Sequence, residues 1–476
     1  LYTRAKELVT KTGFTGNNPY SAYPRKERIK FTIQVKDDVT GTYVPKTAYL
    51  DMIQVRRIEN PKGVWRSAGN SDNFHVTLMR LPYDDAEDFK PFNSEGAWSA
   101  TIVEGGDDFI TLRSTVEGSG SDNAQQTGVK SIEGAGEHPI DFWIDFKGTI
   151  AENSTPRCAI VRVRYHNYTC EHDIYVRQGY APITIDGNAE SDKNPAWASY
   201  NVYCFDADNA PVYTKLPLEE GSLFRRGNRT AILASNNDRP GFTFGLGPSG
   251  SFDVLELGAT TPSQKTWSQL APSADDVKSR FASWSIAGDH ERIATIEDFY
   301  TLESTSIHSN IGKAYGVLYG DGATETQKSV EVALGYDHNE DPTNSKKGMR
   351  GCFVFNINNS HNIFFPIGKS GYGRRKGMTS NGEKVGALRY AQRTDYYNND
   401  GTGNIQYVPL FYDLFERPGA IYQCRNRLSS TGSDVKKSSA FDINYFTMGF
   451  EGFENGASNN SDGSDSDACF IRTVKY

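Results

Sequence analysis

The chain has 476 residues, of which 37% are hydrophobic, and its formal net charge is −8. This length exceeds what one hydrophobic core usually serves, so two or three domains are expected. The 45 glycines, 26 tyrosines and 26 phenylalanines favour a folded, turn-rich chain over a disordered one. The negative charge, with no cluster of Lys and Arg, argues against nucleic acid as a partner.

The N-terminal part of the chain reads as a series of strands. Alternation of apolar and polar residues predicts strands at 28–35, 48–55, 74–79, 98–103, 109–112 and 140–146. Two more strands, 158–165 and 168–176, flank His166-Asn167 and predict a hairpin. About eight strands with no convincing helix between them predict an antiparallel β-sandwich over residues 1–185.

Two polar segments interrupt this pattern. Residues 117–137 are rich in Gly, Ser, Asn and Gln, so we expect a long exposed loop there. Residues 186–195 are polar and turn-forming and show no periodicity. We therefore place the boundary between two domains in 186–195.

From Trp197 onward the strands are shorter and two helices are expected. Ser273 can cap a helix over 274–283. Thr295-Ile-Glu-Asp298 resembles a capping box, with Asp in place of the usual Glu, and predicts a helix that reaches about Ser304. Further strands are expected at 315–319, 351–357, 362–365, 441–448 and 469–476. This mixture indicates an α+β domain over residues 196–476.

Four segments of residues 196–476 form a recognisable pattern. They are Trp197-Ala-Ser-Tyr-Asn201, Arg292-Ile-Ala-Thr-Ile-Glu-Asp-Phe299, Phe364-Phe-Pro366 with Gly371-Tyr-Gly-Arg374, and Phe470-Ile-Arg-Thr-Val-Lys475. This pattern resembles the bacterial major paralogous domain family, whose members share a C-type-lectin-like fold. The chain departs from the family at Thr473, where a cysteine is expected. Farther upstream, Val176-Arg-Gln-Gly-Tyr-Ala-Pro182 resembles the terminal strand of immunoglobulin-like domains in exported Bacteroidetes proteins.

Together the two resemblances imply a mainly β protein, with an N-terminal immunoglobulin-like β-sandwich followed by a C-type-lectin-like α+β domain. This architecture is similar to that of cell-adhesion and fimbrial tip proteins exported by Bacteroidetes. It implies a non-catalytic surface adhesin or fimbrial tip subunit that binds a glycan or protein ligand, with no cofactor. Pilin or other surface-assembly subunits are the implied partners. An unpaired sheet edge of the sandwich could accept a donor strand from another subunit, and the sequence leaves open whether such an edge exists.

The implied location is the cell surface, the outer membrane or a fimbrium. No run of 18 apolar residues exists, so membrane attachment is expected only through an export signal or lipid anchor that precedes Leu1. The alternative function is that of a glycan-capture surface lipoprotein in a carbohydrate-uptake system.

One segment has the composition of a ligand-binding surface. Tyr396, Tyr397, Asn398, Asn399 and Asp400 combine aromatic rings with amide and carboxylate groups. Aromatic rings stack on apolar faces of a carbohydrate or peptide, and short polar side chains fix its hydroxyl groups. The competing interpretation is an ordinary turn whose tyrosines pack inward.

Two groups of residues resemble metal ligands. His166, Cys170 and His172 are spaced H-x3-C-x-H, but His166 lies in the predicted turn and only the other two share a strand face. The segment 459–467 has three aspartates suited to calcium, but no Glu closes it as in an EF-hand. We therefore expect no metal site, and a solvated loop at 459–467.

No catalytic signature is present. The chain lacks a Gly-x-Ser-x-Gly elbow and an HExxH motif, and 371–376 has no strand-to-helix phosphate-loop context. The resemblance also raises the formylglycine-generating enzymes, which share the general fold and would need closely placed reactive cysteines. The six cysteines form no CxxC pair, and their pairing stays open. Cys158 and Cys170 lie at unequal distances from His166-Asn167, so no disulfide is expected between them.

Overall fold

The computed structural model describes residues 25–54, 58–80, 90–106, 108–115, 126–136, 138–188, 190–225, 229–233, 251–266, 290–302, 310–327, 348–366, 389–391, 408–410, 419–425, 440–444, 449–453 and 468–476. Within these residues the protein is mainly β, with one short helix. This agrees with the predicted predominance of strands. No helix among the described residues has the length and hydropathy needed to cross a bilayer.

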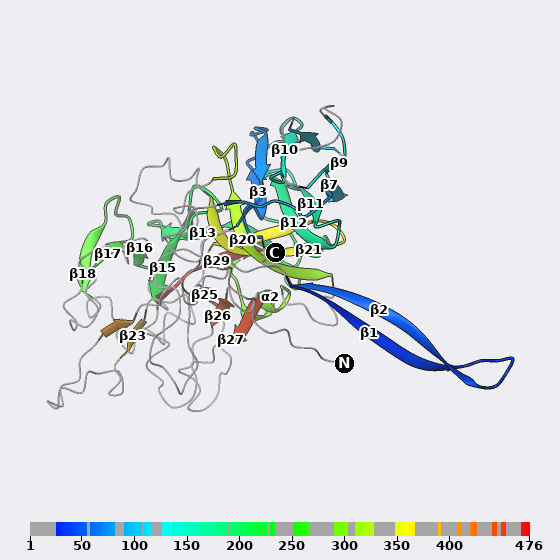
Figure 1. The fold of residues 1–476 in the computed structure, drawn as a ribbon. Coiled ribbons are helices and arrows are strands. Elements are labelled where there is room, and N and C mark those ends of the chain that lie inside the picture. Colours follow the sequence, from blue (N-terminus) through cyan, green and yellow to red (C-terminus); the bar gives the residue numbers. More distant parts are fainter. Residues whose placement is uncertain are drawn as a thin grey trace.

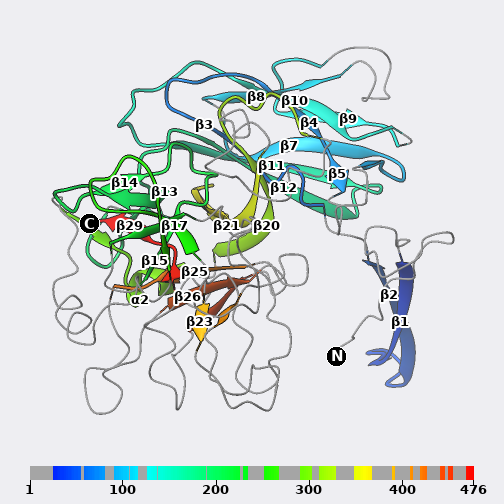
Figure 2. The same cartoon turned by 90° about the vertical axis from the view of Figure 1, so that its left-hand side faces the viewer.

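The first two strands form a separate hairpin. Strands β1 (Arg25–Lys36) and β2 (Tyr43–Gln54) pair along their whole length and form a two-stranded sheet of their own. Figures 1 and 2 show this hairpin, which we call the arm (residues 25–54), projecting from the rest of the molecule. The alternation in these strands predicted membership of the sandwich. It arises instead from an arm that has one apolar face.

Two sheets follow the arm. The smaller contains β4 (Phe74–Thr77), β8 (Ile110–Ser114) and β10 (Asp141–Phe146). The larger contains β3 (Gly63–Arg66), β7 (Trp98–Gly105), β9 (Ser131–Gly134), β11 (Arg157–Tyr165), β12 (Cys170–Gln178), β20 (Ile311–Tyr319), β21 (Met349–Asn356) and β22 (Asn362–Pro366). Two short strands, β5 (Met79–Arg80) and β6 (Lys90–Pro91), pair with each other and lie between β4 and β7 in the sequence.

The two sheets enclose one hydrophobic core. Their strand orders are β4-β10-β8 and β22-β21-β20-β3-β12-β11-β7-β9, and Figure 2 shows the smaller sheet lying over the larger one. Phe74 and Phe142 from the smaller sheet share a buried cluster with Val161 and Ile174 from the larger sheet. Burial alternates along β10, as the sequence pattern predicts. This packing is consistent with a β-sandwich.

The predicted hairpin is confirmed. Strands β11 and β12 pair antiparallel around a turn at 166–169, and Cys158 lies opposite Arg177 while Cys170 lies opposite Tyr165. The two cysteines therefore do not face each other. None of the six cysteines forms a disulfide bond.

The large sheet extends across the predicted boundary at 186–195. Strand β3 pairs in parallel with both β12 and β20, so strands from residues 1–185 and from residues 196–476 belong to one sheet. Side chains reinforce this seam: Arg66 Nη1 donates to the carbonyl of Gly320 at 2.8 Å, and Trp65 Nε1 donates to Asn362 Oδ1 at 2.9 Å. The domain boundary at 186–195 stays a prediction from sequence. In the structure, hydrogen bonds join residues on its N-terminal side to residues on its C-terminal side.

The rest of the chain forms smaller sheets. One contains β13 (Ala196–Phe205), β14 (Pro211–Tyr213), β19 (Glu291–Ile293) and β29 (Arg472–Lys475). Another contains β15 (Ser222–Arg225), β16 (Ala231–Leu233), β17 (Ser251–Leu255), β18 (Ser263–Thr266) and β28 (Ala468–Cys469). The remaining pairs and triplet are β23 (Arg389–Ala391), β24 (Val408–Leu410), β25 (Gly419–Gln423), β26 (Ala440–Asn444) and β27 (Gly449–Phe453).

One loop prediction needs correction. The polar segment 117–137, predicted to be a single exposed loop, contains strand β9, which pairs with β7. Only Ile132 marks this strand in the sequence, and its side chain is fully buried while Ser131 and Glu133 on either side are exposed. A single apolar residue gives too little periodicity for a strand to be recognised.

Candidate functional site

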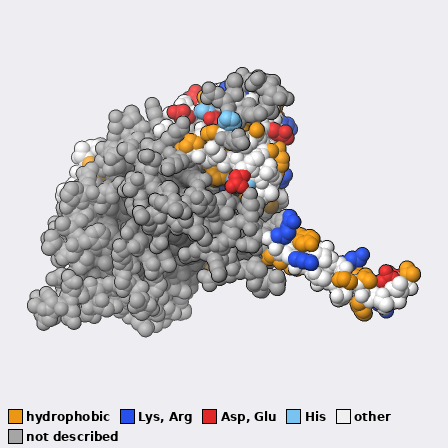
Figure 3. All heavy atoms as spheres, in the orientation of Figure 1, with side chains coloured by type: hydrophobic (Ala, Val, Ile, Leu, Met, Phe, Trp, Pro, Cys, Tyr) orange, Lys and Arg blue, Asp and Glu red, His pale blue; other side chains and the backbone are white. Residues whose placement is uncertain are grey.

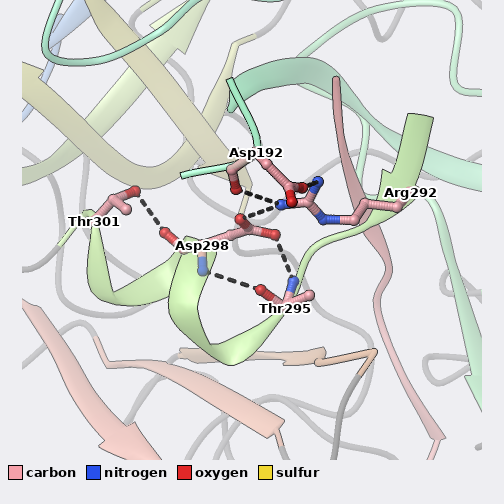
Figure 4. Close-up of polar contacts among 5 residues, drawn as sticks. All are labelled: Asp192, Arg292, Thr295, Asp298 and Thr301. Atoms are coloured by element: carbon pink, nitrogen blue, oxygen red, sulfur yellow. Dashed lines mark hydrogen bonds and ion pairs between the residues drawn. The ribbon is translucent and has the colours of Figure 1, made fainter. Parts of the chain in front are cut away.

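The predicted capping box opens the single described helix, α2 (Ile296–Tyr300), which follows β19. Thr295 Oγ1 accepts a hydrogen bond from the backbone N–H of Asp298, and Asp298 Oδ2 accepts one from the backbone N–H of Thr295 at 2.7 Å. These two bonds satisfy N–H groups that a helix start leaves without partners. Figure 4 shows the arrangement, in which Thr301 also donates to the carbonyl of Asp298.

Arg292 connects this helix start to the linker 186–195. Its Nη2 donates to Asp298 Oδ1 at 2.8 Å, and its Nη1 donates to Asp192 Oδ1 at 2.9 Å (Figure 4). The guanidinium also lies 4.3 Å from the ring centroid of Tyr476 at the last strand. The side chains of Arg292 and Asp298 are 8% and 3% exposed, whereas that of Asp192 is 79% exposed.

The electrostatics of this cluster favour a structural role. Burial raises the pKa of Asp298, although hydrogen bonds from Thr295 and the Arg292 charge act in the opposite direction. The carboxylate and the guanidinium neutralise each other inside the protein, where an unpaired charge would be strongly unfavourable. Arg292 thereby holds the linker, the helix and the final strand together, and its contacts are made within the chain.

Aromatic residues from several distant segments meet in one core. Trp197 packs against Phe299 with ring centroids 5.0 Å apart and against Phe365 at 6.0 Å. Phe365 also packs edge-on against Tyr422 at 5.2 Å. All four side chains are buried and belong to the same cluster, to which Phe470 and Val474 of the closing segment also belong.

Arg472 anchors the closing strand inside this core. It is fully buried, and its guanidinium donates to Asn201 Oδ1 at 2.7 Å and to the carbonyls of Ala198 and Phe364 at 2.8 and 2.9 Å. It also lies 4.7 Å from the ring centroid of Phe365. Burial lowers the pKa of Arg472. The hydrogen bonds join the ends of three segments that are far apart in the sequence.

The predicted ligand-binding residues Tyr396, Tyr397, Asn398, Asn399 and Asp400 lie outside the described residues. In sequence they fall between β23 and β24, two strands that pair antiparallel. The predicted helix at 274–283 and the segments 371–376 and 459–467 are also outside the described part of the chain. These assignments stay predictions.

The histidines considered as metal ligands have other partners. His172 is buried, and its Nε2 donates to the carbonyl of Pro61 at 2.7 Å. His166 lies in the turn, where its Nδ1 accepts a hydrogen bond from the backbone N–H of Glu95 at 2.8 Å. Among the residues that the structure describes, no three His, Cys, Asp or Glu side chains are grouped as metal ligands.

The thiols that the structure describes lie mostly in apolar surroundings. Burial raises the pKa of Cys352 to about 12, and it also raises the pKa of Cys158 despite the charge of Arg177 nearby. A thiol with a raised pKa is protonated at neutral pH and is a poor nucleophile. Cys352 and Cys158 therefore lack the thiolate character that a reactive cysteine needs.

A row of stacked side chains crosses the smaller sheet, and the sequence analysis did not identify it. His75 of β4, Trp143 of β10 and Arg113 of β8 are opposite one another in the register. His75 stacks on Trp143 at 4.5 Å and 11°, and the guanidinium of Arg113 lies 4.6 Å from the indole centroid. Trp143 therefore has one of these side chains beside it on each adjacent strand. The row is a cross-strand stabilising contact.

A second feature absent from the sequence analysis is the buried carboxyl of Glu219. It precedes β15 and is 3% exposed, and its Oε2 accepts the backbone N–H of Lys215 at 3.0 Å. Burial raises its pKa to about 7, partly offset by the hydrogen bond from Lys215. The pair Glu219-Glu220 directly after Leu218 is the only sequence signal for it. A carboxyl with such a pKa changes charge near neutral pH.

Replacement of Glu219 by glutamine is expected to remove a pH dependence of stability. The pKa is higher in the folded protein than the ordinary value of 4.5, so the folded state binds the proton more tightly. The contribution to stability is therefore greatest below about pH 4.5 and is lost as the pH rises through 7. The free energy of unfolding of Glu219→Gln, relative to that of the wild type, should therefore rise by about 2–3 kcal/mol between pH 5 and pH 8.

The measurement is urea unfolding of both proteins at pH 5 and pH 8. Glu190→Gln, which changes an exposed carboxylate, is the matched control and should leave the pH dependence intact. An identical stability difference between Glu219→Gln and wild type at the two pH values would contradict a buried carboxyl with a raised pKa.

Comparison with known proteins adds no relative to these observations. No protein-family model matches the chain, and none of the curated proteins matches it.

Proposed function

We propose that the chain is a non-catalytic surface adhesin or fimbrial tip subunit. In this proposal an immunoglobulin-like sandwich within residues 1–185 joins a surface assembly, and a C-type-lectin-like region within residues 196–476 binds a glycan or protein ligand. The partners would be pilin or other surface-assembly subunits, and the location the cell surface, the outer membrane or a fimbrium.

One observation supports this proposal most. Residues from all four segments that resemble the major paralogous domain family meet around a single core, with Trp197, Phe299 and Phe365 in mutual ring contact. Arg292 and Arg472, both members of the resembling segments, hold the backbone around that core. The proposal is supported by this convergence, because it expects the resembling segments, dispersed over nearly 280 residues of sequence, to share one core.

The position of the predicted ligand residues also fits the proposal. Tyr396–Asp400 occupy the connection between β23 and β24, which is 16 residues long. Binding residues are frequently found on the segments that connect secondary-structure elements.

A binding screen tests the proposal. The full chain is applied to arrays of glycans and extracellular-matrix proteins, and a specific ligand is expected. The double variant Tyr396→Ala, Tyr397→Ala should bind that ligand at least ~10-fold more weakly, because aromatic contacts dominate such interfaces. Tyr168→Ala, at a tyrosine that is 45% exposed on the sandwich hairpin, is the matched control.

The outcomes separate the parts of the proposal. Absence of any ligand on both arrays would contradict the binding function. Unchanged binding by the double variant would place the ligand elsewhere on the protein. Binding confined to soluble oligosaccharides, without association with surface subunits, would favour the glycan-capture alternative.

A further inference from the structure

The arm has two chemically different faces. Because side chains alternate along a strand, the register places odd positions of β1 and even positions of β2 on the same side. We call this side the apolar face; between residues 28 and 50 it consists of Ile29, Phe31, Ile33, Val35, Val44, Lys46, Ala48 and Leu50. The opposite side carries Arg28, Lys30 and Lys36 together with Tyr43 and Tyr49.

The apolar face is open to solvent. Phe31 is 37% exposed, Ile33 61%, Val35 38% and Leu50 48%. Seven of the fourteen exposed large hydrophobic side chains in the described part of the protein lie in the arm, which shows how strongly they are concentrated. Figure 3 shows hydrophobic and basic side chains along the projecting hairpin. Such a patch, rimmed by polar groups, marks an interaction site.

Among the described residues, β1 and β2 pair only with each other, and no arm residue belongs to a buried hydrophobic cluster. An isolated two-stranded hairpin is at best marginally stable in water, and stability normally requires a third strand or a packed face. The arm nevertheless keeps twelve consecutive residue pairs in register. An apolar surface from another molecule would supply the missing packing.

The distribution of charge indicates which molecule packs against the arm. The arm has six Lys and Arg against four Asp and Glu, a net charge of +2, which leaves −10 for the rest of a chain whose total is −8. The body of the protein is therefore electrostatically complementary to its own arm. We propose that the arm docks against the body of a second copy of this chain, with its apolar face turned inward.

The area of the arm favours a reciprocal exchange. Twelve residues span ~40 Å and a two-stranded ribbon is ~10 Å wide, so one face covers about 400 Å². A single docked face would bury about 800 Å² in total, the size of a lattice contact, whereas two exchanged arms bury about 1,600 Å², the size of a stable interface. Packing of the two apolar faces directly on each other is disfavoured, because it would bury Lys46 of both copies within a single-arm area.

Sedimentation equilibrium of the full chain tests the proposal. We expect concentration-dependent formation of a species of twice the 52.8 kDa chain mass. The double variant Phe31→Thr, Ile33→Thr keeps β-branched residues in the strand and should raise the dissociation constant at least ~10-fold. Tyr49→Thr, on the opposite face, is the matched control. Added salt should weaken the wild-type dimer, because it screens the attraction between the basic arm and the acidic body.

Three results would overturn the proposal. The first is a wild-type protein that stays monomeric up to ~100 μM, well above the Kd of a standard-size interface. The second is a dimer whose dissociation constant is unchanged in the double variant Phe31→Thr, Ile33→Thr. The third is a monomer that binds anionic lipid vesicles through Phe31 and Ile33, which would make a membrane surface the occupant of the apolar face. Near-ultraviolet circular dichroism that matches wild type establishes that each variant retains its folded body.

Discussion

Replacement of Phe365 by alanine is expected to lower the free energy of unfolding by about 3–5 kcal/mol. The ring is fully buried and lies between Trp197, Phe299 and Tyr422, with the guanidinium of Arg472 on it at 4.7 Å. Its removal leaves a cavity where β13, β22 and α2 meet, and it removes the cation–π contact of a buried arginine.

Equilibrium unfolding in guanidinium chloride measures this effect. Phe365→Leu retains most of the side-chain volume and should lower the free energy of unfolding by only about 1–1.5 kcal/mol. Ile357→Ala, at a side chain that is 52% exposed, is the surface control and should change stability by less than about 0.5 kcal/mol. A cost below about 1 kcal/mol for Phe365→Ala would contradict the central position of this ring.

Separate expression of residues 1–185 and 196–476 is expected to give two chains that do not fold alone. In the intact protein β3 lies between β12 and β20, so the cut would break the pairing of β3 with β20 and expose a new sheet edge on each fragment. The cut would also remove two of the four acceptors of the fully buried Arg177, Asn362 O and Ser199 Oγ, and leave only the carbonyls of Gly179 and Ala181. Loss of hydrogen bonds to a buried guanidinium destabilises a fold.

Amide chemical-shift dispersion of each fragment, compared with the full chain, measures this outcome. Mixing or co-expression of the two fragments is the control, because it restores the missing strands and should restore dispersed spectra. A dispersed spectrum from either isolated fragment that superimposes on part of the full-length spectrum would instead establish the segment 186–195 as a boundary between autonomous domains.

Local features of this fold could be predicted from the sequence. The alternation at 98–103 and 140–146 and the hairpin around His166-Asn167 correspond to β7, β10 and the β11–β12 pair. The capping box at Thr295 was identified even with Asp298 in place of Glu. Each of these depends on residues within one element or its immediate neighbour, so the sequence contains the whole signal.

The sheet arrangement could not be predicted in the same way. Strand β3 has only four residues, all buried, and shows no alternation, although it lies in the middle of the largest sheet. Its partners β12 and β20 are far away in the chain. The arm has the same alternation as a sandwich strand, yet in the described structure its apolar side chains stay exposed. The residues of a strand do not encode whether another sheet covers them.

Some candidate functional groups could be recognised from local sequence, and others could not. Tyr396–Asp400 were selected by composition, which is a property of the segment itself. The pKa of Glu219 depends on burial by distant residues, and the row of His75, Trp143 and Arg113 depends on the register of three strands. Neither property has a signature within a few residues of sequence, so both became visible only in three dimensions.

The parallel pairing of β3 has a consequence for biosynthesis. Gly63 is opposite Leu318, so after β3 leaves the ribosome about 250 further residues must be translated before its second neighbour exists, a delay of ~10–50 s at ordinary elongation rates. Throughout that interval the nascent polypeptide exposes an incomplete sheet. We expect ribosome-bound chains shorter than about 320 residues to be protease-sensitive and to recruit chaperones.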